Sequence, residues 1–185
     1  MDKQAETTEN HYKNAQINSS EIIKSPRIAI REDKVNLPNG KDKIYHIVLH
    51  PGACAILPID SDGKIIFVRQ YRHAVEEILL EIPAGIIDHG ENPLTCARRE
   101  LREETGYNCK EIKPMINIFT TPGFTNEQLY LYIAKGLYPD PLIAEDSDEI
   151  DVIKYTLEES LQMVMSGKIA DAKTVVAILY YKGLI

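Results

Sequence analysis

Three glutamates and an arginine stand close together in the stretch Arg99-Glu-Leu-Arg-Glu-Glu104. If this stretch is helical, successive residues turn by about 100°, so Glu100, Glu103 and Glu104 share one face. Like charges at this spacing cost an isolated helix roughly 0.2–0.5 kcal/mol per pair. Oxygen ligands alone favour a hard cation such as Mg²⁺ or Mn²⁺. The face therefore indicates a metal site, and the alternative is a solvated helix held by pairs such as Arg99–Glu103.

A magnesium site of this kind usually shares its ion between protein carboxylates and the phosphates of a substrate. Water bound to such an ion is a natural nucleophile for a phosphate anhydride. The chain has 21 Lys+Arg against 28 Asp+Glu, a formal net charge of −7, so its surface repels phosphate on average. A phosphate-bearing substrate therefore needs a metal ion or a well-placed arginine. The same charge argues against a nucleic acid or an anionic membrane as partner.

The helix that carries these acids has readable ends. Asn92 suits the N-cap, Pro93 suits the first helical position, and Gly106 suits the position after the last turn. An apolar stripe beside the acidic face is expected to bury the helix, and it consists of Leu94, Ala97 and Leu101.

Strands surround this helix in the prediction. Asn-Gly at Leu37-Pro-Asn-Gly40 predicts an antiparallel hairpin between 27–31 and 43–48. A turn at Asp60-Ser-Asp-Gly63 predicts a second hairpin between 53–57 and 65–70. Further strands are predicted at 78–82, 115–119, 128–133 and 150–155, and closing helices at 157–166 and 171–181. Strands with helices among them, without strict alternation, favour a mixed α/β (α+β) sandwich.

Length and cysteine usage bound the remaining possibilities. At 185 residues the chain is one domain with a small appendage. Residues 1–20 are polar, so we expect no secretory signal, and no apolar run approaches the roughly 18 residues of a membrane span. Three cysteines without a C-x-x-C pair indicate reduced thiols. We expect a cytoplasmic protein with no membrane partner.

The stretch from Gly85 to Tyr107 resembles the Nudix box, written G-x5-E-x7-R-E-U-x-E-E-x-G-U, where U is a bulky aliphatic residue. Every fixed position of the box is filled in register by Gly85, Glu91, Arg99, Glu100, Leu101, Glu103, Glu104 and Gly106. Tyr107 departs from the pattern, at a packing position. The resemblance implies a Nudix-type α/β/α sandwich with a mixed sheet, and a hydrolase that uses a divalent metal ion.

Three segments beyond the box resemble the ADP-ribose pyrophosphatase branch of that family. They are Val68-Arg-Gln-Tyr-Arg-His73 leading through Leu80-Glu-Ile-Pro-Ala-Gly85, then Thr121-Pro-Gly-Phe-Thr-Asn-Glu127, then Asp171-Ala-Lys-Thr174. Pro122 lies sixteen residues past Gly106, a spacing typical of ADP-sugar hydrolases. We expect two parts: a tail and antiparallel hairpin subdomain at 1–50, and the Nudix hydrolase domain at 51–185.

The resemblance also implies roles for single residues. The metal ligands would be the Ala84 carbonyl and the acids Glu100, Glu103, Glu104 and Asp148. The catalytic group would comprise Glu103, Glu104, Asp146 and Arg99, with Arg99 orienting Glu103. The substrate would contact Arg72, Ile86, Thr121, Pro122, Gly123 and Glu127, and Arg72 would meet its phosphate. The metal is expected to be Mg²⁺, with Mn²⁺ as the other choice.

The general base is expected in the acidic loop Glu145-Asp-Ser-Asp-Glu149, where the family usually has glutamates. Asp146 and Asp148 align with those positions, but aspartate is one methylene shorter. Either the loop lies closer to the site, or a neighbouring Glu145 or Glu149 takes the role.

Taken together, the resemblance predicts Mg²⁺-dependent hydrolysis of the pyrophosphate bond of ADP-ribose, or a related ADP-sugar, to AMP and ribose 5-phosphate. One alternative is a diphosphatase for another nucleoside diphosphate sugar such as GDP-mannose. Another is a module that binds ADP-ribose without cleaving it, although the intact acids argue against this. The N-terminal hairpin also resembles a segment that family members exchange between subunits, so we expect a homodimer.

Overall fold

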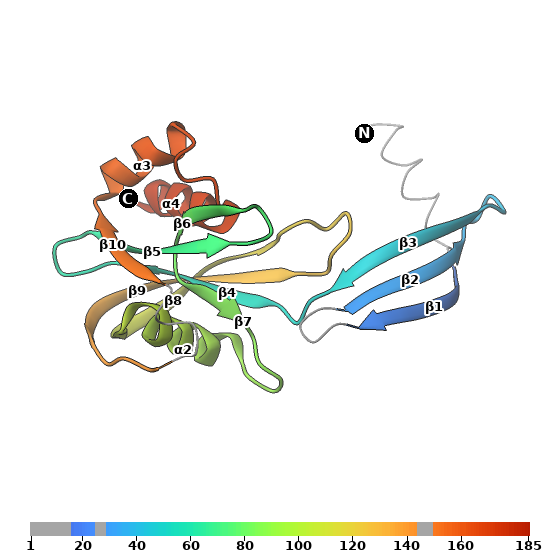
Figure 1. Ribbon diagram of the computed structural model, residues 1–185, viewed down its shortest axis with the longest axis horizontal. Coiled ribbons are helices and arrows are strands. Elements are labelled where there is room, and N and C mark those ends of the chain that lie inside the picture. Colours follow the sequence, from blue (N-terminus) through green and yellow to red (C-terminus); the bar gives the residue numbers. More distant parts are fainter. Residues whose placement is uncertain (1–15, 25–28, 144–149) are drawn as a thin grey trace. The chain divides into compact units, whose positions relative to one another are not determined.

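The computed structural model of the protein describes residues 16–24, 29–143 and 150–185 (Figure 1). It divides into two compact units. The first is drawn from Met1–His50 with Thr121–Glu127, and the second from Pro51–Thr120 with Gln128–Ile185.

The first unit contains a three-stranded antiparallel sheet in the order β1-β2-β3, formed by β1 (Gln16–Lys24), β2 (Ala29–Asn36) and β3 (Asp42–Leu49). In the turn between β2 and β3, Gly40 has a φ of +77°, which glycine adopts at little cost. The predicted hairpin is confirmed. The sequence did not predict β1, because its polar centre lacks the alternation that marks a strand.

The second unit is built on two sheets. A mixed four-stranded sheet has the order β7-β4-β9-β8, in which β4 and β9 are parallel, and an antiparallel three-stranded sheet has the order β10-β5-β6. Their strands are β4 (Ala53–Pro58), β5 (Ile65–Arg72), β6 (Glu77–Glu81), β7 (Ala84–Ile86), β8 (Tyr107–Phe119), β9 (Gln128–Pro139) and β10 (Asp151–Tyr155).

The predicted hairpin between residues 53–57 and 65–70 is wrong in its pairing. The turn forms, with the Asp60 carboxylate accepting the N–H groups of Asp62 and Lys64. However, β4 and β5 join different sheets, and only an isolated bridge between Ile59 and Ile65 links the two segments. β4 and the first four residues of β5 are buried without polar interruption, so local sequence could not reveal which neighbours they pair with.

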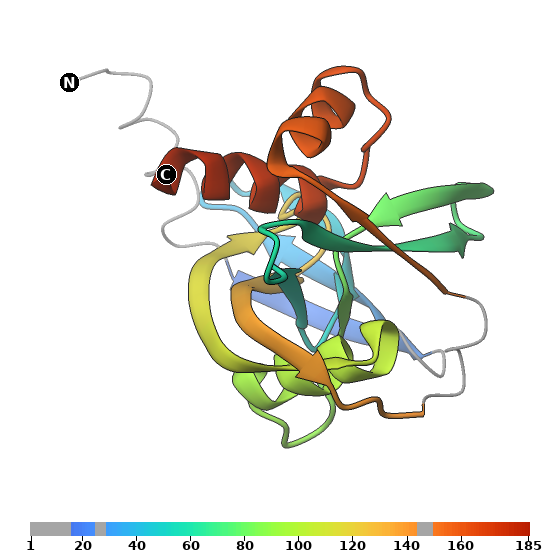
Figure 2. The same cartoon turned by 90° about the vertical axis from the view of Figure 1, so that its left-hand side faces the viewer.

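Helices cover the four-stranded sheet on both sides (Figures 1 and 2). The helices are α2 (Pro93–Thr105), α3 (Leu157–Met165) and α4 (Ala172–Leu184). Alternate residues of β4 point to opposite faces: Ala55 and Leu57 pack in a core with Ile178 of α4, whereas Cys54 and Ile56 pack with residues of α2. The predicted α/β/α sandwich is confirmed.

The ends of α2 match the sequence. The Asn92 side chain accepts the N–H of Thr95, and Gly106 has a left-handed φ of +75° with its N–H donating to the Arg102 carbonyl. One predicted core position is wrong: Leu94 is 43% exposed, whereas Ala97 and Leu101 are fully buried. Leu94 lies in the first turn of the helix and takes no part in the core that Ala97 and Leu101 form with Cys54 and Ile56.

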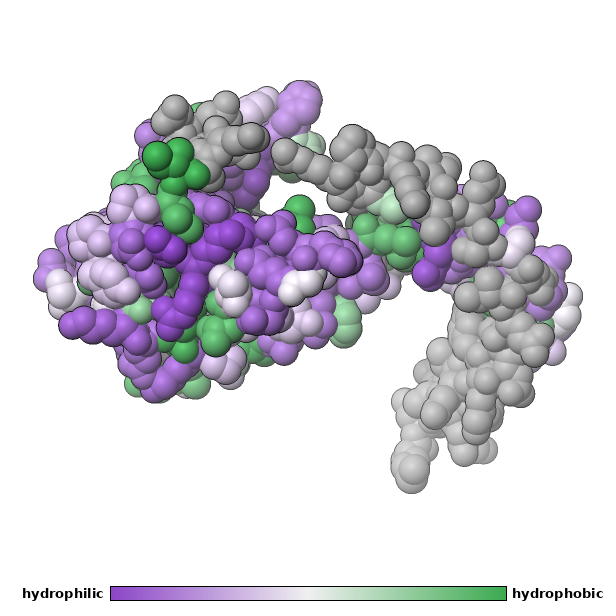
Figure 3. Space-filling model, turned by 90° about the horizontal axis from the view of Figure 1, so that it is seen from below, coloured by the Kyte–Doolittle hydropathy of each residue, from purple (hydrophilic) through white to green (hydrophobic). Residues whose placement is uncertain are grey.

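No helix in the described ranges combines the length and the apolar character needed to cross a membrane. Figure 3, which looks onto the α2 side of the second unit, shows hydrophilic side chains interrupted by separate hydrophobic ones.

Candidate active site

The acidic face of α2 lies against the short strand β7. This strand pairs with β4 through Ala53–Ile86 and Ala55–Ala84, so a fully buried strand holds its backbone in place. A Cβ atom added to Gly85 would stand 1.9 Å from Oε1 of Glu100. Glycine at this position therefore allows the Glu100 carboxylate to lie directly on the β7 backbone, as the box pattern requires.

Glu104 reaches the same strand from the last turn of α2. One of its carboxylate oxygens accepts the N–H of Ala84 at 2.9 Å. Burial raises the pKa of Glu104 from its ordinary value of 4.5 to about 8, and the charge of Glu100 adds to this, while Arg72 and Lys173 act in the opposite direction. Burial also raises the pKa of Glu100, although Arg99 opposes that shift. Two carboxylates thus face β7 with too little positive charge for both.

Arg99 joins the acids of α2 to the loop before it. Its guanidinium binds Glu91 through Nε at 3.0 Å and Nη2 at 2.9 Å, and its Nη1 donates to Glu103 at 2.9 Å and to Glu100. Nη2 also donates to the carbonyl of Ile86 at 3.0 Å. The hydrogen bond to Glu91 is the main reason that the pKa of Arg99 is raised. Arg99 therefore holds Glu91, Glu100 and Glu103 together around the β7 backbone.

Arg72 ends β5 and makes a two-point contact with Glu81 at the end of β6. Nε lies 2.7 Å from Oε1, and Nη2 lies 2.8 Å from Oε2. Lys173 of α4 binds the same carboxylate. Burial alone would raise the pKa of Glu81, but its hydrogen bonds and the charges of Arg72 and Lys173 outweigh burial and hold the pKa below its ordinary value. Sequence reasoning missed Glu81 and Lys173; a glutamate inside the apolar run 78–82 was the available signal.

The segment Thr121–Glu127 lies in the first unit. The Thr121 carbonyl accepts the N–H of Phe124 at 3.1 Å, and the Val48 N–H donates to the Phe124 carbonyl at 2.7 Å. A cavity of about 340 Å³ opens beside this segment and is lined by Arg31, Tyr45, Ile47, Leu49, Pro122, Gly123, Phe124, Thr125 and Asn126. Two predicted substrate residues thus line the cavity. Thr121 and Glu127 are not in its lining, and Glu127 lies 3.6 Å from His50.

The remaining predicted residues divide into two groups. Ile86 is 42% exposed on β7, next to the acids, and its side chain is accessible. Asp146 and Asp148, together with Glu145 and Glu149, lie outside the residues that the structure describes.

The donor set on α2 fits a hard divalent cation. It offers carboxylate oxygens next to the Ala84 backbone, and since burial raises the pKa of both Glu100 and Glu104, a bound cation would favour their charged forms. Within residues 16–24, 29–143 and 150–185, no three acidic, histidine or cysteine side chains converge as a finished metal cage. Glu100 and Glu103 point toward Arg99 instead, so a cation would have to draw them from it.

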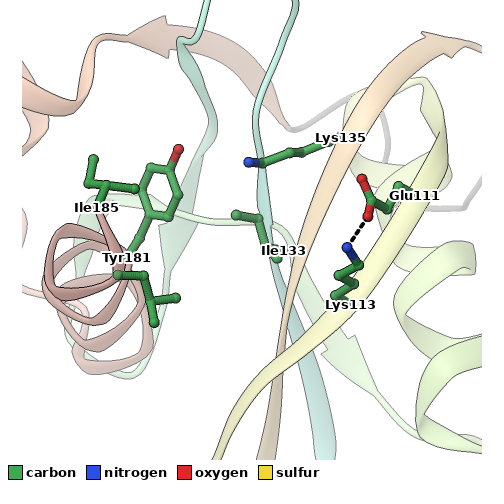
Figure 4. Close-up of a pocket in the computed structure, with 7 residues that line it drawn as sticks. Glu111, Lys113, Ile133, Lys135, Tyr181 and Ile185 are labelled. Atoms are coloured by element: carbon green, nitrogen blue, oxygen red, sulfur yellow. Dashed lines mark ion pairs between the residues drawn. The ribbon is translucent and has the colours of Figure 1, made fainter.

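A second cavity, of about 240 Å³, lies between the β8–β9 pair and the end of α4 (Figure 4). It is lined by Glu111, Lys113, Ile133, Lys135, Tyr181, Leu184 and Ile185. Lys113 pairs with Glu111, and Nζ of Lys135 lies 5.9 Å from the centre of the Tyr181 ring. This cavity contains none of the predicted site residues.

Comparison with known proteins defines the class. The NUDIX domain model matches residues 48–176. The chain is 43% identical over 166 residues to the methanol dehydrogenase activator of Bacillus methanolicus, covering 89% of this chain and 90% of that one. It is 39% identical over 166 residues to the ADP-ribose pyrophosphatase of Bacillus subtilis, with the same coverage. A GDP-mannose pyrophosphatase of Salmonella typhimurium is 33% identical over 140 residues, 70% of this chain and 72% of that protein.

A crystal structure of an ADP compounds hydrolase has the same fold, with a TM-score of 0.83, 20% sequence identity and coverage of 94% of this chain and 95% of that one. The chain therefore belongs to the Nudix family. It is a Nudix hydrolase, as the box spacing and the β7–α2 geometry indicate.

Proposed function

We propose that this chain hydrolyses the pyrophosphate bond of ADP-ribose, or of a related ADP-sugar, to AMP and ribose 5-phosphate. The observation that carries the proposal is the placement of Glu100 and Glu104 on the β7 backbone, where burial raises the pKa of both acids. The 39% identity to an ADP-ribose pyrophosphatase supports the choice of substrate.

The proposed reaction assigns a metal-binding role to the acids of α2. Glu100, Glu103, Glu104 and the Ala84 carbonyl would hold Mg²⁺ or Mn²⁺, with Asp148 as a further ligand. When bound, the ion would offset the pyrophosphate charge and acidify water. Arg99 keeps the acids in place through its hydrogen bonds.

The reaction itself adds water to one phosphorus atom and breaks the bridging P–O bond. We assign the proton of that water to Asp146, with Glu145 and Glu149 as the neighbouring candidates. Arg72 is 39% exposed at its side chain, and we assign it to an oxygen of the pyrophosphate. A guanidinium placed there stabilises the charge that develops as the bond breaks.

The 340 Å³ cavity of the first unit is our candidate for recognising the nucleoside. Its volume lies in the range usual for small-molecule sites. Tyr45 and Phe124 supply aromatic surface, and Arg31 and Asn126 supply polar groups. Substituting Phe124 by Ala should raise KM for ADP-ribose while leaving kcat nearly unchanged, since the contact would bind substrate and transition state alike.

A substrate panel tests the proposal. Release of AMP would be measured with ADP-ribose, ADP-glucose, GDP-mannose and NADH, each with Mg²⁺ and with Mn²⁺. The highest kcat/KM is expected for ADP-ribose. A higher value for GDP-mannose would favour the second candidate, which the 33% identical relative supports. Tight binding of ADP-ribose without turnover would overturn hydrolysis and leave a sensing module.

The oligomeric state and the compartment are also proposals. We propose a homodimer, because the three-stranded sheet of the first unit leaves Ile30 and Ile44 exposed. We propose the cytoplasm, because the three cysteines are free and buried, as is usual where thiols stay reduced. Light scattering in solution tests the first of these, and fractionation of cells tests the second.

A further inference from the structure

Lys173 lies on α4, far along the chain from the Nudix box, and is partly buried. Its side chain is 12% exposed, and its ammonium binds the Glu81 carboxylate and, at 3.0 Å, the carboxylate of Asp171. Glu81 is 2% exposed at its side chain and separated from Lys173 by 92 positions. A buried ion pair of this kind needs a reason, since an apolar pair is often equally stable.

The reason is not the attachment of α4. Asp171 already caps this helix by accepting the N–H of Thr174 at 3.0 Å. The Thr174 hydroxyl accepts the N–H of Ile82 at 2.9 Å and so ties the helix to the residue after β6. Both contacts are complete without the lysine. We therefore look for the role of Lys173 in its effect on the charge and position of Glu81.

Glu81 also binds Arg72, and the two cations share its charge. In the described part of the chain, Glu81 is the one side chain to which the Arg72 guanidinium donates. With Lys173 present, Glu81 is neutralised from two sides, and part of the Arg72 charge remains for a ligand. Without Lys173, Arg72 would be the only cation that binds the Glu81 carboxylate. Glu81 would then offset the charge of Arg72, and less of that charge would remain for a ligand.

Lys173 also stiffens the arrangement. A carboxylate held by one partner can rotate with that partner, whereas Glu81 is held from β5 and from α4 at once. The fork of Arg72 is rigid, so fixing Glu81 fixes the direction of the guanidinium. Both cations also lie near enough to Glu104 to act on its charge.

We propose that Lys173 is a positioning residue for Arg72: acting through Glu81, it orients the guanidinium and preserves its charge for the pyrophosphate of the substrate. This deepens the proposed function and rests on it. Lys173 itself touches neither the substrate nor the metal in this scheme.

The first test is a set of variants assayed with ADP-ribose. Lys173→Met should raise KM about tenfold and change kcat by less than about twofold, since substrate affinity is what Arg72 loses. Binding of ADP-ribose in EDTA, measured by calorimetry, should weaken by a similar factor. Lys173→Arg restores the charge and should recover most of the affinity. Lys154→Met, which removes the lysine of a pair with Asp60, is the matched control and should leave KM unchanged.

A double-mutant cycle separates this role from a merely structural one. If Lys173 acts through Arg72, adding Lys173→Met to Arg72→Ala should change affinity by less than about twofold. The same tenfold loss in both backgrounds would overturn the proposal. A lower melting temperature of Lys173→Met that explains the lost affinity, and that Lys173→Arg does not restore, would also overturn the proposal.

A second measurement does not depend on the substrate. The order parameter of the Arg72 Nε–H bond, from nuclear magnetic resonance, reports how firmly the guanidinium is held. It should fall in Lys173→Met and recover in Lys173→Arg. An unchanged value would overturn the proposal. Absence of turnover by the wild-type chain, with this mobility pattern intact, would instead refute only the proposed function.

Discussion

Two regions of the second unit bury carboxylates and treat them in opposite ways. At the end of β6, Glu81 has Arg72 on one side and Lys173 on the other, and its pKa lies below the ordinary value. On α2, Glu104 has a single backbone N–H as hydrogen-bond partner within the described ranges, and its pKa is raised to about 8. Burial acts on both, so the difference lies in the cations that each has. Cationic side chains offset the charge of Glu81, whereas Glu104 has no cationic hydrogen-bond partner among the described residues.

The largest expected effect is a loss of activity when Glu104 is substituted. Glu104→Gln should lower kcat for ADP-ribose roughly 1,000-fold, because the variant loses a proposed metal ligand where charge develops. Folding should be preserved, since the amide oxygen can still accept the Ala84 N–H. Steady-state assays at saturating Mg²⁺ and thermal unfolding would be compared with Glu158→Gln, which removes an exposed acid of α3. Near-normal turnover in Glu104→Gln would refute the metal-site assignment.

The next effect is a loss of stability when Glu81 is substituted. Glu81→Gln should lower the free energy of unfolding by about 3 kcal/mol, because Arg72 and Lys173 would be left partly buried without their anion. Urea denaturation of the metal-free protein measures the change. A loss well below about 1 kcal/mol would mean that Glu81 contributes no more than an ordinary surface pair.

The comparison also shows what sequence could predict of the site. The shared face of Glu100, Glu103 and Glu104 was predicted from their spacing, because they lie on one helix whose ends are set by local residues such as Asn92 and Gly106. Their roles, and that of Arg99, were predicted from the resemblance to the Nudix box. Glu81 was not predicted, because its cations come from 9 and 92 positions away. The residue type does not reveal such a distant partner.

In the fold, too, features set by local contacts could be predicted, whereas features set by distant contacts could not. The ends of α2 and the capping box of α3, where Thr156 and Glu159 bind each other, follow from contacts within one turn. The separation of β4 and β5 into two sheets depends on which distant strands pair with them, and the turn that joins them is compatible with a hairpin. Sequence therefore predicted the sandwich and most of its elements, but it missed β1 and β7 and misassigned this pairing.

A third effect is on the pH dependence of stability in the metal-free protein. The folded-state pKa of Glu104 lies above the ordinary value of 4.5, so between about pH 4.5 and 8 the folded state binds more protons than the unfolded state. Stability should therefore fall as the pH rises through this window, by on the order of 2 kcal/mol once hydration and relaxation are considered. Denaturation across that range would be compared with Glu104→Gln, in which this component should vanish. Equal slopes for both proteins would contradict the assignment, and added Mg²⁺ should flatten the wild-type slope.

The smallest effect is expected at an ion pair that is not buried. Arg69 and Asp151 pair across β5 and β10, but their side chains are 51% and 63% exposed. Water already solvates both charges, so Arg69→Gln should change the free energy of unfolding by less than about 1 kcal/mol. The change should shrink further in 1 M salt, where screening is strong. Urea denaturation at low and high salt checks both statements. A loss as large as that of Glu81→Gln would show that burial is not what distinguishes the Glu81 cluster, and the contrast with Glu104 would then need another cause.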